Sequence, residues 1–268
     1  MWVDCSGFQK TVSPVRCGRF SFSICIGIDG SLFLLLELSV SFKKSRFKRE
    51  EIMCGRYRLT VSKTQLEEHY RAIASGLKPF EPSLNVTPGS EVPVVAVGRE
   101  KIPVLTTFRW GLIPSWSKSE KTGYKMINAR SETVTIKPSF SKPFQRSRCL
   151  IPCNGFYEWK GDGKEKRPWL IKRSDEEVLS LAGLYDRWRS PAGEDLFTFT
   201  ILTTKANRVM EKIHDRMPVI LNPEAYSFWL GSGSGGKQLE ELLRPFEDSL
   251  MTLQEGISPH SDPHPGSQ

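Results

Sequence analysis

A cysteine that directly follows a methionine carries the most distinctive chemistry of this sequence. In the segment 53–57 (MCGRY), Cys54 becomes N-terminal if translation begins at Met53 and that methionine is removed. An N-terminal cysteine presents an amine and a thiol two carbons apart, so it can condense with an aldehyde: the amine forms an imine, and the thiol closes a five-membered thiazolidine. An internal cysteine lacks this reaction because its nitrogen is an amide. The chemistry therefore depends on whether residues 1–52 stay attached.

Three polar side chains beside apolar residues are further candidates for catalysis. Asn128 follows an apolar pair, Glu158 lies between two aromatic residues, and His214 follows an expected helix. Side chains alternate along a strand, so Glu158 shares a face with Phe156, which is an unusual place for a carboxylate. Each residue also has a structural interpretation: Asn128 as a backbone cap, Glu158 as a solvent-facing strand residue, and His214 at a helix C-terminus, where the dipole favours a cation.

The composition is typical of a soluble globular protein, with 268 residues of which 38% are hydrophobic and 25% charged. The net charge is +8; residues 1–52 contribute +3 and the rest +5. A basic excess favours a polyanionic partner such as nucleic acid. The six cysteines do not suggest a disulfide framework. Cys149 and Cys153 fit buried strand residues better than a zinc site, and His260 and His264 fit a solvated tail, so neither a metal nor another cofactor is expected.

The chain divides into three parts. Residues 1–52 contain an apolar run that is too short and interrupted for a spanning helix, and too far from the start for a clear signal peptide. We interpret these residues as an extension outside the functional fold, either removed or the result of a start assigned too far upstream. Residues 53–250 form the functional domain. Residues 251–268 are expected to be a divergent, disordered tail.

The elements that position the candidate residues are short. Helices are expected over 61–74, with Ser62 as N-cap and Gly76 as stop, and over 206–213, 223–230 and 238–243. A loop is expected over 84–89. Strands are expected over 92–97, 104–110, 148–152, 156–159, 168–172, 179–185 and 196–203. Many short strands with few short helices indicate an α+β fold, with one domain built on a curved, mainly antiparallel β-sheet and short peripheral helices.

Five motifs in order resemble the SRAP family, the SOS-response-associated peptidases or abasic-site-processing proteins. The resemblance covers roughly residues 53–230, and five motifs in order make it specific. They are CGR at 54–56, RWGLIPSW at 109–116, NARSE at 128–132, GFYEW at 155–159 and HDRMP at 214–218. The C-terminal segment departs from the family pattern, which continues into a further strand. If that strand is missing, a sheet edge is left exposed.

The resemblance implies a protein that links covalently to abasic sites in single-stranded DNA in the DNA damage response. Cys54 matches the mature N-terminal cysteine, which forms a thiazolidine with the ring-opened deoxyribose. Asn128, Glu158 and His214 match the other catalytic residues. The positions that match DNA-contacting residues are Arg56, Asn85, Trp116, Arg130, Trp159 and Thr203.

These residue types suit the implied roles. An α-amine has a pKa of about 7.7–8.0, so a useful fraction is neutral at pH 7. Glu158 can take and return protons, His214 can protonate the sugar ring oxygen, and Asn128 can donate to a developing hydroxyl. Arginines can bind phosphates bidentately, and Trp116 can stack on unpaired bases.

The family's peptidase label implies a second reaction. Through an N-to-S shift, the Cys54 thiol could attack the preceding carbonyl, and hydrolysis would then release residues 1–53. Two alternatives remain open: a cysteine peptidase acting on itself or on other proteins, and a noncovalent single-strand-binding module with a structural Cys54. An imine also permits weak lyase activity. We expect a monomer with no membrane partner, located in the cytoplasm near the nucleoid in a bacterium or in the nucleus of a eukaryote.

Overall fold

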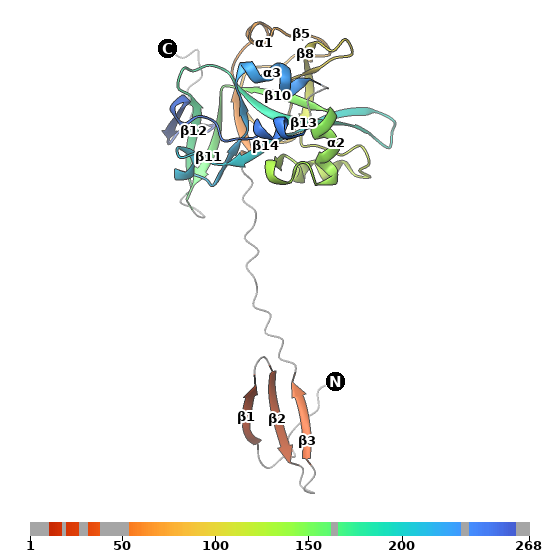
Figure 1. Ribbon diagram of the computed structural model, residues 1–268, viewed down its shortest axis with the longest axis vertical. Coiled ribbons are helices and arrows are strands. Elements are labelled where there is room, and N and C mark those ends of the chain that lie inside the picture. Colours follow the sequence, from red (N-terminus) through yellow and green to blue (C-terminus); the bar gives the residue numbers. More distant parts are fainter. Residues whose placement is uncertain are drawn as a thin grey trace. The chain divides into compact units, whose positions relative to one another are not determined.

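The computed structural model describes the backbone of three N-terminal strands and residues 54–161, 166–231 and 236–260. Contacts divide the chain into two units, residues 1–51 and 52–268. In the first unit, β1 (Thr11–Cys17), β2 (Phe20–Ile26) and β3 (Leu32–Glu37) form an antiparallel sheet. The second unit holds all the candidate residues and is built on two further sheets (Figure 1).

The larger sheet of the second unit closes into a ring of five strands. Its order is β14-β13-β10-β7-β8, and β8 then pairs in parallel with β14. The ring strands are β7 (Glu91–Val97), β8 (Pro103–Trp110), β10 (Arg148–Cys153), β13 (Leu179–Arg189) and β14 (Asp195–Lys205). The shorter strands β5 (Ile73–Ala74), β9 (Asn128–Arg130), β15 (Arg216–Pro218) and β16 (Ile220–Leu221) pair with members of this ring. Ring closure places β9 and β15 against β14, where several candidate residues lie.

The second sheet is antiparallel and has the order β17-β12-β11-β4-β6. Its strands are β4 (Arg56–Leu59), β6 (Ser83–Val86), β11 (Gly155–Lys160), β12 (Arg167–Arg173) and β17 (Met251–Glu255). One residue, Asn154, separates β10 from β11, so a single chain segment joins the two sheets. Asn154 donates its backbone N–H to the carbonyl of Arg58 and accepts from the N–H of Thr60 at 3.0 Å each. These bonds fix β4 beside the junction.

Short helices lie at the periphery of the second unit, with α3 beside β10 and α2 beside β13 (Figure 1). The α-helices are α1 (Lys63–Tyr70), α2 (Pro138–Arg146), α3 (Tyr226–Leu230) and α4 (Lys237–Glu241). The 3₁₀ turns are η1 (Glu120–Lys125), η2 (Ser131–Thr133), η4 (Met210–Lys212), η5 (Pro223–Ala225) and η6 (Asp248–Leu250). The architecture confirms the predicted α+β class with a mainly antiparallel sheet and short helices.

Helix α1 confirms the predicted N-cap. The hydroxyl of Ser62 accepts from the backbone N–H of Gln65, and the Gln65 side chain accepts from the N–H of Ser62, which forms a capping box. Leu66 and Tyr70, four residues apart, are buried on one face. The helix ends earlier than predicted: its C-cap is Arg71, which adopts a left-handed conformation with φ of 48°, and the predicted stop Gly76 lies five residues further on.

Arg148 is a buried cation that links two peripheral helices. Its Nε and Nη1 donate to the carbonyls of Trp229 and Phe144 at 2.6 Å each, and its Nη2 donates to the carbonyl of Gly231. The guanidinium also lies 5.8 Å from the centroid of the Trp229 ring. These carbonyls lie at the C-terminal ends of α2 and α3. At a helix C-terminus no following turn supplies backbone N–H groups to donate to them. Arg148 therefore fastens both helix ends to β10.

Three sequence-based expectations are wrong. Residues 84–86 belong to β6, because Val86 pairs with Tyr57 of β4, and are not part of a loop. The helix predicted over 206–213 is reduced to the 3₁₀ turn η4. The disordered tail predicted from residue 251 instead begins with β17, which pairs with β12 from Met251 to Glu255. The strand is therefore present, and it covers the edge of β12.

Across the residues that the structure describes, no helix is both long and apolar enough to cross a membrane. Within the same residues, no group of three or more His, Cys, Asp or Glu side chains is placed to hold a metal ion.

Candidate functional site

Cys54 and Glu158 form the centre of the candidate site. The backbone nitrogen of Cys54 lies 2.5 Å from Oε1 of Glu158, to which it donates a hydrogen bond. Strand pairing explains the contact: Arg56 of β4 faces Tyr157 of β11, and continuing the antiparallel register places Gly55 opposite Glu158. Both Cys54 and Glu158 are buried, with 0% and 4% of their surface exposed. A carboxylate therefore lies directly against the nitrogen that would carry the chemistry.

The backbone at Cys54 is in an unfavourable conformation. Its φ of 48° lies in the left-handed region, which costs a residue with a side chain roughly 1–2 kcal/mol. Strain of this kind clusters at functional sites, where the surrounding structure holds it in place. Here the hydrogen bond to Glu158 holds the nitrogen of Cys54, and β4 holds the chain from Arg56 onwards.

The Cys54 thiol is held in its neutral form. Burial raises its pKa well above the ordinary value, and the negative charge of Glu158 and the nearby Cys153 raise it further. Cys153, at the end of β10, has its own pKa raised to about 12 by burial. Of the two reactive groups of Cys54, the nitrogen is therefore the one with a proton acceptor at hand.

Arg56 and Asn85 extend the site along neighbouring strands. Nη1 of Arg56 on β4 donates to Oδ1 of Asn85 on β6 at 2.7 Å. Both residues are half-buried. The backbone N–H of Trp159, half-buried on β11, lies 3.4 Å from Oε2 of Glu158. The second sheet thus groups four predicted site residues with Cys54: Arg56, Asn85, Glu158 and Trp159.

A second group of predicted residues gathers on β14. Strand β9 pairs in parallel with β14, so Asn128 faces Ile201 and Arg130 faces Thr203. Thr203 is buried, whereas Arg130 is exposed at the end of β9. Parallel pairing between β9 and β14 is what brings Asn128, Arg130 and Thr203 together.

Arg216 holds this second group in place. Its Nη1 and Nη2 donate to the two carboxylate oxygens of Glu132 at 2.8 and 2.9 Å, and Nη2 also donates to the Thr203 carbonyl at 2.7 Å. The hydrogen bonds from Arg216 lower the pKa of Glu132. Sequence reasoning missed both residues as members of the site, although each lies two positions after a predicted one. The sequence signal that could have found them is the opposite charge of Glu132 and Arg216, which suits an ion pair.

His214 is oriented through one ring nitrogen. Its Nδ1 accepts from the backbone N–H of Arg216 at 3.0 Å, so the neutral ring carries its proton on Nε2. Nδ1 also lies 2.9 Å from Oδ1 of Asp215, which can accept when the ring is protonated. The ring is therefore held at Nδ1 in either protonation state.

Trp110 connects the two groups. Its ring centroid lies 5.3 Å from that of Tyr57, three residues after Cys54, and 6.3 Å from that of Phe199 on β14. Its indole N–H donates to the carbonyl of Ile127 at 2.9 Å, directly before Asn128. The buried side chain of Trp110 thus contacts both β4 and the residue that precedes β9.

The segment between β8 and β9 is closed by two glycines. A Cβ on Gly111 would lie 2.8 Å from the carbonyl oxygen of Gly123, and one on Gly123 would lie 2.7 Å from that of Gly111. Gly111 also has a φ of 119°, which side chains rarely allow. This backbone contact returns the chain to β9 at Asn128. Trp116 lies on this segment with 62% of its surface exposed.

Comparisons with known proteins agree with this arrangement. The family model for the SOS response associated peptidase (SRAP) matches residues 53–256. Abasic site processing protein YoqW of Bacillus subtilis (strain 168) is 44% identical over 204 residues, covering 74% of this chain and 90% of its own. Abasic site processing protein HMCES of Xenopus tropicalis is 34% identical over 241 residues, covering 73% of this chain and 71% of its own.

A solved structure has the same fold. The X-ray crystal structure of a protein from Bacteroides thetaiotaomicron superimposes with a TM-score of 0.69 and 29% sequence identity. The match covers 79% of this chain and 97% of that chain. Because the family model spans most of the chain and includes both groups of site residues, the chain belongs to the SOS response associated peptidase (SRAP) family.

Proposed function

We propose that this protein processes abasic sites in single-stranded DNA by forming a covalent thiazolidine link through Cys54 once that residue is N-terminal. The observation that carries the proposal is the 2.5 Å contact between the Cys54 nitrogen and Oε1 of Glu158. It supplies a proton acceptor to the atom that must attack an aldehyde. The names of the relatives, which are abasic site processing proteins, support the same substrate.

The reaction begins at the nitrogen. The neutral amine of Cys54 attacks the aldehyde carbon of the ring-opened sugar, and Glu158 takes the proton that the nitrogen loses. Delivered to the alkoxide, that proton gives the carbinolamine; Glu158 then relays the second nitrogen proton to the carbinolamine hydroxyl, so that water leaves and an imine remains. The Cys54 sulfur then adds to the imine carbon, its proton moves to the nitrogen, and the ring closes. The net change is the loss of one water.

The other site residues support these steps. Nε2 of His214 can protonate the sugar ring oxygen, which favours the open aldehyde. Asn128 can donate to the developing hydroxyl without titrating. Arg56 and Arg130 supply cations for phosphates, and Trp116 offers an exposed face for an unpaired base. Because an imine permits β-elimination, weak lyase activity accompanies the main reaction.

Self-cleavage at the Met53–Cys54 bond is the second part of the proposal. The strained φ at Cys54 favours it, because cutting the preceding peptide bond removes that constraint. Cys54 attacks the carbonyl of the preceding residue, the amide becomes a thioester, and water hydrolyses the thioester to free the amine. Removal of Met53 as an initiator methionine leads to the same N-terminus.

The test uses one polypeptide before and after a cut. In a full chain, a protease recognition sequence replaces residues 48–53, so that the cut leaves Cys54 N-terminal. This chain is incubated with an oligonucleotide that contains one abasic site. After the cut, we expect a denaturation-resistant adduct whose mass is the sum of its parts less one water. Without the cut, we expect adduct only on chains whose mass shows that the leader has already been lost, and none on chains that keep it.

Three variants separate the alternatives. Cys54→Ala should abolish the adduct, whereas Cys149→Ala and Cys153→Ala, which change equally buried thiols, should retain it. An adduct formed with the leader still attached contradicts the thiazolidine mechanism. Salt-sensitive binding indifferent to Cys54→Ala favours a noncovalent module, and cleavage of added protein without DNA favours a peptidase.

A further inference from the structure

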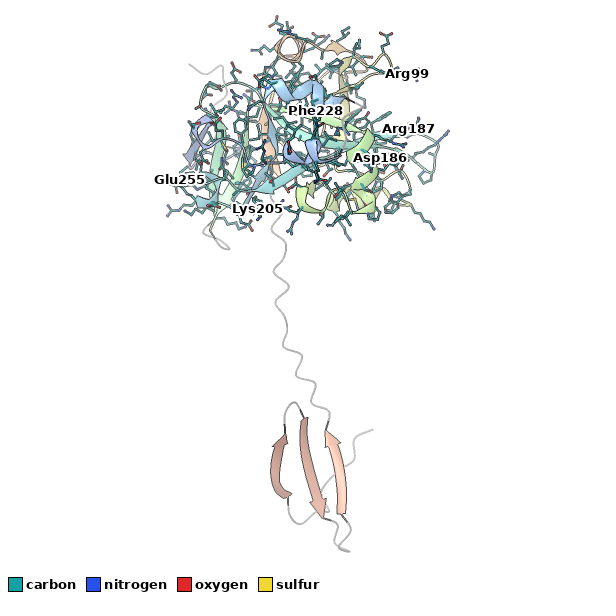
Figure 2. The ribbon with its side chains drawn as sticks, in the orientation of Figure 1. Arg99, Asp186, Arg187, Lys205, Phe228 and Glu255 are labelled. Carbon is teal, nitrogen blue, oxygen red and sulfur yellow. The ribbon has the colours of Figure 1, made fainter. Side chains whose placement is uncertain are left out.

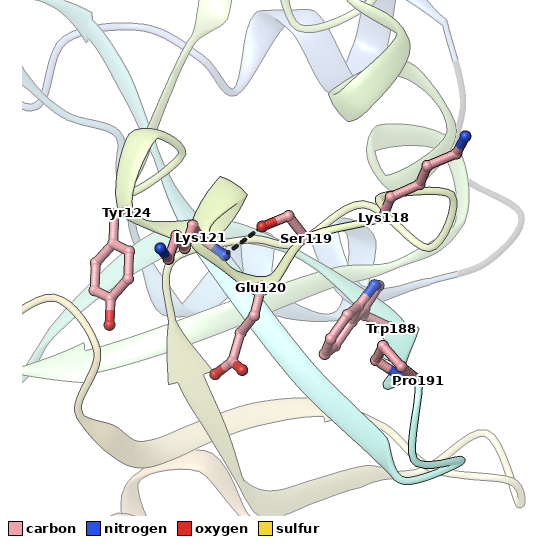
Figure 3. Close-up of a pocket in the computed structure, with 7 residues that line it drawn as sticks. All are labelled: Lys118, Ser119, Glu120, Lys121, Tyr124, Trp188 and Pro191. Atoms are coloured by element: carbon pink, nitrogen blue, oxygen red, sulfur yellow. Dashed lines mark hydrogen bonds between the residues drawn. The ribbon is translucent and has the colours of Figure 1, made fainter.

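We propose that a pocket on the segment between β8 and β9 binds one nucleotide of the DNA strand at a distance from the abasic site. The proposal rests on the proposed function, because it extends the same DNA path. The pocket lies outside both groups of site residues and has a volume of about 440 Å³. Figure 3 shows Tyr124 and Trp188 on either side of Glu120, with Lys118 and Lys121 at the rim.

The pocket combines an aromatic face with positive charge. Tyr124 is 72% exposed, so its ring is open to stacking by a planar group. Lys118 and Lys121 bring two cations to the same opening. Glu120 is the carboxylate of the lining, and its charge is balanced by an ion pair with Arg109. A stacking surface beside unopposed cations suits a base and its phosphate.

The pocket is already formed without a ligand. The hydroxyl of Ser117 contacts that of Thr122 at 2.8 Å and donates to the Ser119 carbonyl at 3.0 Å. The Trp188 indole N–H donates to the Ser117 carbonyl at 2.7 Å, which ties the segment to the β13–β14 hairpin. The contact between Gly111 and Gly123 closes the base of the segment. Binding therefore needs little ordering of the protein, which favours affinity.

The pocket lies along the strand that carries the site. Trp188 pairs with Leu196 near the start of β14, and Ile201, further along β14, pairs with Asn128. Five residues of extended strand span about 17 Å. Asp186 and Arg187, labelled in Figure 2, mark the pocket's end of this hairpin. A DNA strand that places its damaged sugar near Asn128 can therefore reach the pocket within a few nucleotides.

Two exposed aromatic residues lie on the segment that carries the pocket. Trp116 is 62% exposed at the start of the segment, and Tyr124 is exposed near its end, four residues before Asn128. Lys118 and Lys121 lie between them in sequence, and Lys125 follows Tyr124. Aromatic residues interleaved with lysines on one exposed segment are typical of surfaces that bind single strands without sequence preference.

The test compares long and short DNA in binding and in covalent reaction. Fluorescence anisotropy measures the binding of the full chain to single strands without an aldehyde, one long and one of two nucleotides. The variant is Tyr124→Ala combined with Lys121→Ala. The matched control, Ile73→Ala combined with Lys237→Ala, also removes one exposed apolar side chain and one lysine, both outside the pocket.

We expect the pocket variant to bind the long strand about tenfold more weakly, the loss typical of one stacked base, with the short strand unaffected. The control should match wild type on both. With the abasic substrate at saturation, and with Cys54 made N-terminal by the protease cut in both proteins, the covalent rate of the pocket variant should equal that of wild type. Strands that extend on only the 5′ side or only the 3′ side identify which side of the DNA enters the pocket. One of these two strands must show the weaker binding by the pocket variant.

Equal binding of the long strand by variant and wild type overturns the inference. Equal weakening on long and short strands also overturns it, because it indicates damage to the fold or to the main site. Failure of wild type to form any adduct contradicts the proposed function alone, since the binding arm uses DNA without an aldehyde.

Discussion

Glu158 contacts the backbone nitrogen of Cys54 through Oε1, although 104 residues separate them in the sequence. Two antiparallel strands create this contact, β4 immediately after Cys54 and β11 around Glu158. The carboxylate therefore adjoins the atom that starts the proposed reaction, whereas the Cys54 thiol is buried and neutral. This order of reactivity leads to the first prediction.

Glu158→Gln should slow adduct formation by about 10²–10⁴-fold, the usual contribution of a positioned acid–base group. The amide keeps the size of the carboxylate and can still accept a hydrogen bond, so we expect the fold to persist. The measurement is the single-turnover rate of adduct formation by the cut chain on a denaturing gel. A rate equal to wild type would show that Glu158 moves no proton.

The same substitution should make the Cys54 thiol more acidic. The Glu158 charge is the second cause of the raised pKa, after burial, so its removal lowers the pKa while burial keeps it above the ordinary value. The measurement is the pH dependence of iodoacetamide alkylation in the uncut chain, followed by peptide mass. Cys149 is the internal control, because burial alone raises its pKa. A shift of both cysteines together would point to general loosening of the fold.

Arg148→Ala should destabilise the second unit by about 3 kcal/mol or more. It leaves three carbonyls at the ends of α2 and α3 without their donor, and each buried unsatisfied group costs about 1–3 kcal/mol. The measurement is the unfolding midpoint in urea. Arg146→Ala, which removes an exposed arginine two residues earlier, is the control and should change stability by less than about 0.5 kcal/mol. Similar losses in both variants would contradict the role of Arg148.

The pair of Glu132 and Arg216 should contribute stability that depends on pH. Because folding lowers the pKa of Glu132, the contribution is complete above its unfolded pKa of about 4.3 and is lost as pH falls through the lower folded value. The Glu132 side chain is 41% exposed, so solvent screening limits the effect to about 1 kcal/mol or less. Wild type should therefore melt above Glu132→Gln at pH 7, and the gap should shrink below about pH 4. A gap that stays constant with pH would contradict the assignment.

Local patterns predicted the elements whose cause is local. Ser62 and the buried positions Leu66 and Tyr70 predicted α1, because capping and helical spacing act within a few residues. The helix predicted over 206–213 failed for one local and one distant reason. The Asn207 side chain accepts from the Met210 N–H and donates to the distant Phe246 carbonyl, which holds the chain in a turn.

Distant pairings were beyond the sequence. The parallel match of Arg109 with Thr198, which closes the ring, depends on strands far apart in the chain. Likewise, β17 is short and partly polar, and it is a strand because β12 offers an open edge. In the candidate site, the types of Cys54 and Glu158 indicated their chemistry, but their contact and the Arg216–Glu132 bridge required the three-dimensional arrangement.

The left-handed conformation of Cys54 exists only while another residue precedes it. A φ angle is defined by the preceding carbonyl carbon, so in a chain that begins at Cys54 the bond from nitrogen to Cα becomes a free rotor. Rotation about that bond could then aim the lone pair of the amine towards an incoming aldehyde, while an N–H faces the carboxylate of Glu158, without moving β4. Loss of the leader would thus expose the reactive amine of Cys54 and also give it the rotational freedom that the attack requires.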